Sequence, residues 1–305
     1  MALLRIGTRG SPLALIQAEE VQRRLAALPG APATAIEVIR TTGDAVQDRT
    51  LAEIGGKGLF TKEIDEALLD GRIDLAVHSM KDMPTWLPDG IVIAAHLPRE
   101  DPRDALIARH AGSLAELTEG AVVGTASLRR AAQVLMLRPD VRIVPLRGNV
   151  GTRLAKIERG EADATLLAVA GLKRLGMIER ASAILEPDDM LPAIAQGAIG
   201  VAARAGDGRV GDLLARLDDS ATAIAVKAER GFLAALDGSC KTPIAALARV
   251  EGTEVELAGL IVTPDGRSWH RASRRGPAAH AAVLGAEAGR TLRAAAGPDF
   301  FAALG

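Results

Sequence analysis

The feature of this chain that most constrains its fold is a pattern of short apolar runs alternating with helical segments, which occurs twice before the pattern changes. Strands that alternate with helices are typical of α/β sheets with parallel strands. We therefore predict two α/β lobes. The polar, proline-containing segment 99–104 separates the two blocks, and we expect it to be a hinge. A length of 305 residues also exceeds what one hydrophobic core usually organises.

The apolar periodicity assigns elements to both blocks. In the first block we expect helices at 11–28 and 60–69, and strands at 3–7, 35–40, 73–78 and 91–97. Ser11 is suited to be an N-cap and Pro12 the first helical residue. In the second block we expect helices at 127–137 and 152–159, and strands at 121–124, 142–146 and 162–170, the last of which leads into 172–175. The apolar run 192–203 is predicted to return to the first lobe.

From about Thr222 the sequence pattern is different. A helix is expected at 223–236, then strands at 244–250, 254–262 and 268–273 separated by turns, and a closing helix at 278–295. Short strands joined by tight turns predict an antiparallel meander. The prediction is therefore an α/β protein of three domains. Lobe 1 comprises 1–98 and 195–218, lobe 2 comprises 99–194, and a small α+β domain with an antiparallel sheet comprises 219–305.

Composition excludes several classes of function. The formal net charge is −1, aromatic residues make up 2% of the chain and tyrosine is absent, which argues against nucleic-acid binding. No apolar run reaches the roughly 18 residues of a membrane span. The first residues lack the long apolar region of a signal peptide, so we expect a cytoplasmic protein.

The single cysteine, Cys240, cannot form an intramolecular disulfide or anchor a cysteine-rich metal site, and no metal is expected. Its neighbours are turn-forming and solvated residues, among them Gly238, Lys241 and Pro243. Lys241 would favour the thiolate. A structural cysteine and a point of covalent chemistry are both compatible with these neighbours.

Three polar loops lie between a predicted strand and a predicted helix, at 8–11, 124–130 and 146–153. Each places backbone N–H groups, hydroxyls and guanidinium groups at a helix N-terminus, which is a suitable site for an anion. Arg129, Arg130 and Arg153 oppose the helix dipole there, and a bound carboxylate or phosphate would explain them. They could instead be solvated or paired with nearby acids. Three such loops together favour a polyanionic small molecule.

Two further loops carry polar side chains. The segment 54–58 is rich in glycine but lacks the spacing of a phosphate loop, and we interpret it as a lid with one cation, Lys57. The loop 78–82 follows a predicted buried strand and contains His78, Lys81 and Asp82. Asp82 is a candidate general acid or base, or a stabiliser of a developing cation. A turn aspartate that accepts from backbone N–H groups is the alternative.

Taken together, these segments resemble the porphobilinogen deaminase (hydroxymethylbilane synthase) family. The resemblance rests on TRGSPLAL at 8–15, GGKGLF at 55–60, AVHSMKDMP at 76–84, REDPRD at 99–104, GTASLRR at 124–130, LRGNVGTRL at 146–154, LAVAGLKRLG at 167–176, LPAIAQGAIG at 191–200 and the loop around Cys240. These motifs occur in the order of the family and span most of the chain.

The resemblance implies a fold and a reaction. The fold has three domains, of which the first two are similar to the lobes of periplasmic binding proteins. The reaction joins four porphobilinogen molecules head to tail with release of ammonia and gives hydroxymethylbilane. The family carries a dipyrromethane cofactor attached by a thioether to a cysteine, and the matching position is Cys240.

The resemblance also implies roles for single residues. Asp82 matches the catalytic carboxylate, which would assist loss of ammonia and stabilise the azafulvene cation. The cofactor-binding positions are Cys240, Lys81, Ser79, Thr125, Ser127, Arg129, Arg130, Arg147 and Gly148. The substrate-binding positions are Arg9, Ser11, Gln17, Arg147, Arg153 and Gln196, with His78 as a further residue of the cleft. Because each pyrrole carries an acetate and a propionate, fixed cations are what such a cleft requires. Glu53 and Ala126 depart from the lysine and serine frequent in bacterial members.

We therefore expect a monomeric, cytoplasmic transferase of tetrapyrrole and heme biosynthesis that binds porphobilinogen, with no nucleic acid or membrane as partner. The first alternative is a non-catalytic, two-lobed binding protein for a small polyanion, which explains the arginine loops but gives Cys240 and Asp82 no role. The second is a cysteine-nucleophile hydrolase, for which no histidine lies near the thiol in the sequence.

Overall fold

The structure, a computed structural model, describes residues 3–42, 61–238 and 242–302. The chain divides into two compact units. Unit 1 comprises Met1–Glu100 and Ala198–Ala223, and unit 2 comprises Asp101–Gly197 and Ile224–Gly305. The chain therefore passes from one unit to the other after Glu100, after Gly197 and after Ala223.

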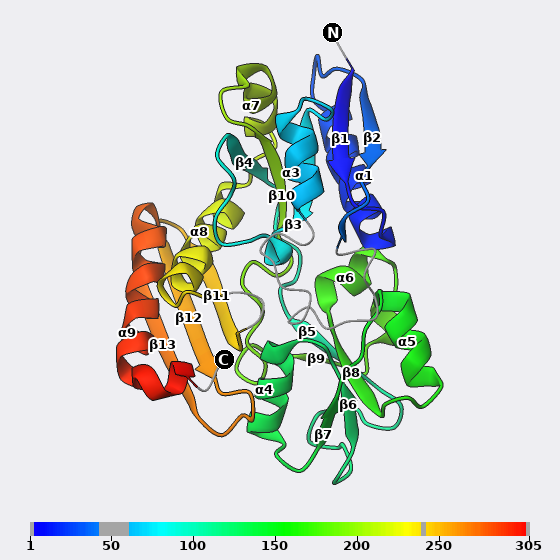
Figure 1. Ribbon diagram of the computed structural model, residues 1–305, viewed down its shortest axis with the longest axis vertical. Coiled ribbons are helices and arrows are strands. Elements are labelled where there is room, and N and C mark those ends of the chain that lie inside the picture. The colour runs from blue at the N-terminus through cyan, green and yellow to red at the C-terminus, as the bar shows by residue number, and fades with distance from the viewer. Residues whose placement is uncertain (1–2, 43–60, 239–241, 303–305) are drawn as a thin grey trace. The chain divides into compact units, whose positions relative to one another are not determined.

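Unit 1 contains a five-stranded sheet of order β2-β1-β3-β10-β4 (Figure 1). Its strands are β1 (Leu4–Thr8), β2 (Thr34–Val38), β3 (Leu75–Ser79), β4 (Ile91–His96) and β10 (Ile199–Arg204). β1 is parallel to β2 and β3, whereas β10 is antiparallel to both β3 and β4. The buried side chains of β3 point alternately to the two faces of the sheet, so other elements must pack on both faces.

Helices supply that cover. α1 (Pro12–Ala26) and α7 (Gly208–Ala215) pack on the face that includes Leu75 and Val77. α3 (Lys62–Leu69) packs on the opposite face, which includes Ala76. A short 3-10 turn, η1 (Met80–Asp82), follows β3 directly. The polar residues that follow β1 and β3 therefore lie at one edge of a rigid sheet.

Unit 2 contains a second five-stranded sheet with the equivalent order, β7-β6-β8-β5-β9. Its strands are β5 (Asp104–Ala108), β6 (Val122–Gly124), β7 (Arg142–Val144), β8 (Ala164–Ala168) and β9 (Ala183–Leu185). β5 is antiparallel to both of its neighbours, as β10 is in the first sheet. α4 (Leu128–Leu137) packs on one face, and α5 (Val150–Glu158) and α6 (Val169–Arg174) pack on the other.

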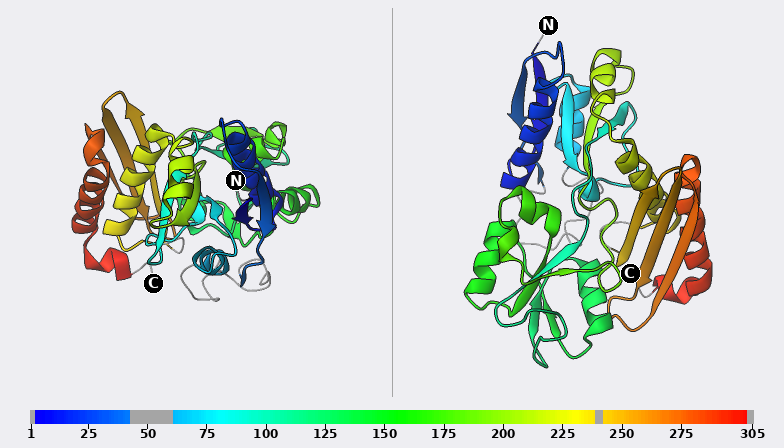
Figure 2. Two further views of the ribbon diagram at one scale, coloured as in Figure 1. Left: turned by 90° about the horizontal axis from the view of Figure 1, so that it is seen from above. Right: turned by 180° about the vertical axis from the view of Figure 1, so that it is seen from behind.

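The C-terminal part of unit 2 is a three-stranded antiparallel sheet with two helices. Its strands are β11 (Ile244–Glu251), β12 (Glu254–Val262) and β13 (Trp269–Pro277), in that order. α8 (Ser220–Ala235) and α9 (Ala281–Ala302) lie side by side next to the sheet (Figure 2). Ala245, Leu247, Leu260 and Val262 on the other face of the sheet pack with Ala132 of α4. This apolar cluster joins the small sheet to the larger one.

The predicted fold class, two α/β lobes and a small C-terminal domain with an antiparallel sheet, is confirmed. The run 192–203 returns to the first sheet as β10, as predicted. The predicted parallel pairing is confirmed for β1, β2 and β3 and for β6, β7 and β8. It is wrong for β10 and β5, which are antiparallel because they enter their sheets directly from the other unit, without the helical crossover that parallel pairing requires. β5, β9 and α7 were not predicted. The three-domain boundaries remain a prediction. Within the described ranges, every helix is too short or too polar to cross a lipid bilayer.

Candidate functional site

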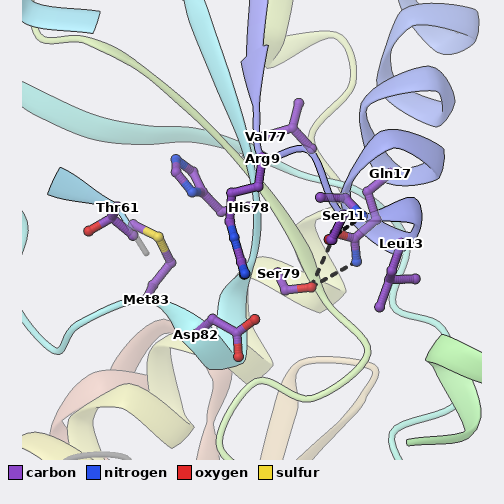
Figure 3. A pocket seen from close by; sticks show the side chains of 11 residues that line it. Arg9, Ser11, Leu13, Gln17, Thr61, Val77, His78, Ser79, Asp82 and Met83 are labelled. Atoms are coloured by element: carbon purple, nitrogen blue, oxygen red, sulfur yellow. Dashed lines mark hydrogen bonds between the residues drawn. The ribbon is translucent and has the colours of Figure 1, made fainter. Parts of the chain in front are cut away.

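A pocket of about 70 Å³ lies in unit 1, where β1 and β3 end and α1 begins (Figure 3). Five residues predicted to bind substrate or cofactor or to be catalytic line it: Arg9, Ser11, Gln17, Ser79 and Asp82. Leu13, Ala14, Thr61, Val77, His78 and Met83 complete the lining. The sheet topology thus brings together residues that are more than 70 positions apart in the chain, such as Arg9 and Asp82.

The start of α1 fixes one wall of the pocket. Oγ of Ser11 accepts a 3.3 Å hydrogen bond from N of Ala14, and Pro12 follows as the first helical residue, so the predicted N-cap is confirmed. Oγ1 of Thr8 donates to the carbonyl oxygen of Ala14 at 3.2 Å. These bonds hold the turn that carries Arg9, whose guanidinium group points toward Asp82 in Figure 3.

The opposite wall is joined to α1 by a buried amide. Nε2 of Gln17 lies 2.8 Å from Oγ of Ser79, and Oε1 of Gln17 lies 3.1 Å from the same oxygen. The Gln17 side chain is buried, and Ser79 is the last residue of β3. This pairing sets the distance between the helix and the loop that continues to Asp82.

Asp82 is the last residue of the η1 turn and is exposed at the pocket. N of Met80 donates to the carbonyl oxygen of Ala198 at 3.0 Å, and N of Met83 donates to that of Met80 at 3.3 Å. The turn is therefore anchored to the residue that precedes β10, while its carboxylate stays accessible. Lys81 precedes Asp82 on the same turn and is half-buried. An accessible carboxylate on a fixed backbone can stabilise a cation or transfer a proton.

His78 is almost fully buried in the pocket wall. Burial, together with the positive charge of Arg9, lowers the pKa of His78 to about 4. The imidazole is consequently neutral at physiological pH. Its Nε2 atom has no hydrogen-bond partner among the described residues.

In unit 2 the loop after β6 is held by its own hydroxyl groups. Oγ1 of Thr125 accepts from N of Ser127 at 3.1 Å, and Oγ of Ser127 accepts from N of Arg130 at 3.4 Å. Ser127 is thus the N-cap of α4, at the start of the predicted helix. These bonds fix the backbone at the N-terminus of α4.

Arg129 and Arg130 are buried and share one carboxylate, that of Asp104. Nη2 of Arg129 lies 2.7 Å from Oδ2 of Asp104, and Nη2 of Arg130 lies 2.6 Å from Oδ1. Burial acts to raise the pKa of Asp104, but the two guanidinium groups outweigh it and hold that pKa well below its usual range. From the sequence, the partner of Arg129 and Arg130 could be either a bound anion or a nearby acid. In the structure it is, in part, an acid of the chain itself, Asp104.

The loop after β7 carries Arg147 and Gly148 and leads into α5. Asn149 caps α5 by accepting from N of Thr152 at 2.9 Å, so the helix begins two residues earlier than predicted. Gly148 has φ 116°, and a methyl group there would come within 2.6 Å of Thr152, so only glycine fits. Nε of Arg153 donates to the carbonyl oxygen of Gly148 at 2.7 Å.

Gln196 lies just before the chain leaves unit 2. Its Nε2 donates to the carbonyl oxygen of Pro102 at 2.7 Å and to Oδ1 of Asp104 at 3.0 Å. Sequence reasoning assigned Gln196 to the substrate and missed Asp104. The apolar run 105–108 directly after Asp104, bounded by Pro102, is the signal of a short buried strand that could have identified it.

Some predicted residues cannot be placed. Cys240, Lys241, Glu53 and the lid 54–58 lie outside the described residues. Within the described residues, no cluster of three or more His, Cys, Asp or Glu side chains is arranged to hold a metal ion.

Comparisons with known proteins identify the family. The family model "Porphobilinogen deaminase, dipyromethane cofactor binding domain" matches residues 4–212, and the model "Porphobilinogen deaminase, C-terminal domain" matches 223–294. The chain belongs to the porphobilinogen deaminase family. A relative named porphobilinogen deaminase from Nitrobacter winogradskyi is 58% identical over 301 residues, which cover 98% of this chain and 95% of the relative. One of the same name from Paracoccus denitrificans is 56% identical over 300 residues, with 98% and 96% covered.

Among solved structures, a periplasmic substrate-binding protein of an ABC transporter from Coxiella burnetii is 17% identical, covers 70% of this chain and 91% of its own, and has a TM-score of 0.43. That likeness is too weak to inform ligand or function.

The residues of unit 2 fit the dipyrromethane of the porphobilinogen deaminase family. Arg129, Arg130 and Asp104 form a buried cluster with two positive charges and one negative charge. Nε of Arg129 is buried without a hydrogen-bond partner among the described residues. A buried cluster with excess positive charge and an unused N–H suits a group that carries carboxylates.

Proposed function

We propose that the chain is a hydroxymethylbilane synthase, which joins four porphobilinogen molecules head to tail with release of ammonia. Membership in the porphobilinogen deaminase family supports this activity. The structural observation that carries it is a pocket in which the Asp82 carboxylate and the Arg9 guanidinium face the same space. This arrangement combines proton chemistry with a cation for an anionic substrate.

The pocket residues have separate tasks in this proposal. Arg9 binds a carboxylate of porphobilinogen, because a guanidinium group offers two parallel N–H donors to it. Asp82 stabilises the positive charge that develops on the pyrrole nitrogen as ammonia leaves. After the terminal ring of the chain attacks, Asp82 accepts the α-proton of that attacking ring. The neutral His78 adds no second cation beside Arg9. Gln17 and Ser79 hold the walls at a fixed separation.

The dipyrromethane, when bound through Cys240, supplies the free pyrrole position from which the chain grows. In this proposal Lys81, Ser79, Thr125, Ser127, Arg129, Arg130, Arg147 and Gly148 hold its carboxylates, and Ser11, Gln17, Arg147, Arg153 and Gln196 act with Arg9 on the substrate. Arg147 and Arg153 belong to the loop and first turn at the start of α5. Their helix N-terminus adds a favourable dipole for an anion.

Intact-mass measurement of the purified chain tests the proposal. The wild-type protein should carry the mass of two pyrrole units and convert porphobilinogen to hydroxymethylbilane. Cys240→Ser should lack the added mass and the activity, with an unchanged far-UV spectrum. An active wild-type protein of unmodified mass would exclude the covalent cofactor. A folded protein that binds porphobilinogen without consuming it would instead support the two-lobed binding protein.

We propose that the protein is a monomer in the cytoplasm. We also propose that it has no nucleic-acid partner, since the formal net charge is −1 and aromatic residues make up only 2% of the chain. Sedimentation equilibrium of the purified protein tests the monomer, and a mass twice that of the chain would contradict it.

A further inference from the structure

Asp104 is fully buried and meets three side chains of unit 2, two from the start of α4 and one from the segment before the chain leaves the unit. Its carboxylate accepts from Arg129 at 2.7 Å, from Arg130 at 2.6 Å and 3.2 Å, and from Gln196 at 3.0 Å. Neither of its oxygens is left for solvent or ligand. Asp104 therefore cannot contact a substrate, and what it does must act through the groups it binds.

The sheet register explains why this carboxylate lies at the N-terminus of α4. Asp104 is the first residue of β5 and is paired with Ala168, the last residue of β8. β8 runs parallel to β6, so Asp104 lies at the sheet edge where these two strands end. The loop 125–127 and the start of α4 follow β6 at that same edge.

Both guanidinium groups are fixed in orientation as well as in position. Nη1 of Arg129 donates to the carbonyl oxygen of Leu191 at 2.8 Å, and Nη1 of Arg130 donates to that of Leu166 at 2.9 Å. Asp104 binds each group on a second nitrogen. Because a guanidinium group is planar, two such attachments determine which of its N–H groups remain for a ligand. Nε of Arg129 is buried and has no hydrogen-bond partner among the described residues.

The same carboxylate also sets the net charge of the cluster. With Asp104 ionised, the cluster carries one excess positive charge, and without it two buried guanidinium groups would repel each other across a short distance. Asp104 thus makes it possible to bury two arginines side by side and still leave one charge for an anion.

We infer that Asp104 is a positioning residue for the cofactor arginines: it orients Arg129 and Arg130 so that they hold the carboxylates of the dipyrromethane. This inference rests on the proposed function. It predicts that changes at Asp104 reduce both the assembly of the cofactor and the turnover of molecules that carry it.

Two substitutions separate charge from position. Asp104→Asn keeps the shape and removes the charge, whereas Asp104→Glu keeps the charge and displaces the carboxylate by one methylene. For each variant we would measure the fraction carrying the two-pyrrole mass, then kcat and KM per cofactor-bearing molecule, and thermal unfolding. Asp163→Asn is the matched control, since Asp163 directly precedes β8, at the opposite end of that strand from Ala168, and accepts a 2.7 Å hydrogen bond from N of Val122.

We expect Asp104→Asn to slow acquisition of the two-pyrrole mass and to lower kcat per cofactor-bearing molecule by roughly 10-fold to 100-fold, as misplacement of a binding group does. KM for porphobilinogen should change by less than about threefold, because Arg9 and the unit 1 pocket are untouched. A purely structural role would lower the cofactor-bearing fraction and leave kcat per bearing molecule unchanged, which would overturn the inference. If Asp104→Asn does not fold, Asp104→Glu decides by the same criterion.

A double-mutant cycle supplies a second readout. In an Arg129→Gln/Arg130→Gln background, Asp104→Asn should slow acquisition of the two-pyrrole mass by less than about threefold, because the groups it positions are gone. A full additional loss would show that Asp104 acts elsewhere.

The wild-type protein distinguishes the two proposals. A wild-type chain without the two-pyrrole mass overturns the proposed function together with this inference. A normal wild-type protein with normal Asp104 variants overturns the inference alone.

Discussion

Nε2 of Gln17 in α1 lies 2.8 Å from Oγ of Ser79 at the end of β3, and this contact joins the two elements that form the pocket. The residue after Ser79 begins the η1 turn that ends with Asp82. The position of the candidate catalytic carboxylate is therefore set by the core of unit 1, through a buried side chain on a neighbouring helix. A catalytic pocket requires a reactive side chain that is accessible to substrate and is held by a rigid backbone.

Asp82→Asn should lower turnover by roughly 10² to 10³, because loss of one charged group that stabilises the transition state has this size of effect. KM for porphobilinogen should be nearly unchanged, since the cations that bind its carboxylates remain. Steady-state kinetics of the cofactor-bearing variant measure both parameters. Asp89→Asn is the control, as Asp89 is exposed and does not line the pocket. Near-normal kcat in Asp82→Asn would remove Asp82 from its proposed role.

His78 should make the protein less stable in mild acid. Its pKa is about 4 in the folded state and near 6.5 in the unfolded chain, so the unfolded state binds the proton first as the pH falls. The stability that the buried, neutral His78 contributes is complete above pH 6.5. As the pH falls toward 4, the free energy of unfolding decreases by about 2 to 3 kcal/mol. Urea unfolding at several pH values should show this loss in wild type and a smaller one in His78→Leu. Parallel pH profiles would contradict the assignment.

Asp65 on α3 should have the opposite pH dependence. Burial raises its pKa to about 6, and its Oδ1 has no hydrogen-bond partner among the described residues. Because the folded-state pKa lies above the unfolded one, ionisation destabilises the fold as the pH rises from about 4 through 6. Asp65→Asn should therefore raise the free energy of unfolding at pH 8 and change it little at pH 4. Equal effects at both pH values would argue against a titrating Asp65.

Gly285 in α9 permits the close approach of α8. A methyl group at Gly285 would lie 1.9 Å from the carbonyl oxygen of Ala228, which is backbone and cannot move aside. Gly285→Ala should destabilise unit 2 by about 2 kcal/mol, in the range of overpacking substitutions. Gly211→Ala in α7 is the matched control, because nothing lies near its added methyl group. It should be neutral or stabilise by up to about 1 kcal/mol. Thermal unfolding of both variants measures the difference.

Local sequence was sufficient for the elements whose signals are contained in a few residues. Ser11 with Pro12 and Ser127 before α4 were predicted as helix starts, because a cap is a contact between residues three positions apart. The antiparallel C-terminal sheet was predicted from its two tight turns. β5 was missed, since its five residues show no alternation and directly follow a polar segment.

The sequence by itself determined the two-lobed α/β class, the family and the residue types available to an anionic substrate. It could not determine which arginines are paired with an acid of the chain itself. Arg129 and Arg130 resemble Arg9 as residues at a loop or helix start, yet they are buried on Asp104, 25 and 26 positions away. Only the tertiary structure decided this, because the order of strands in the sheet sets which charges meet in the interior. Burial then makes each such contact far stronger than it would be in water.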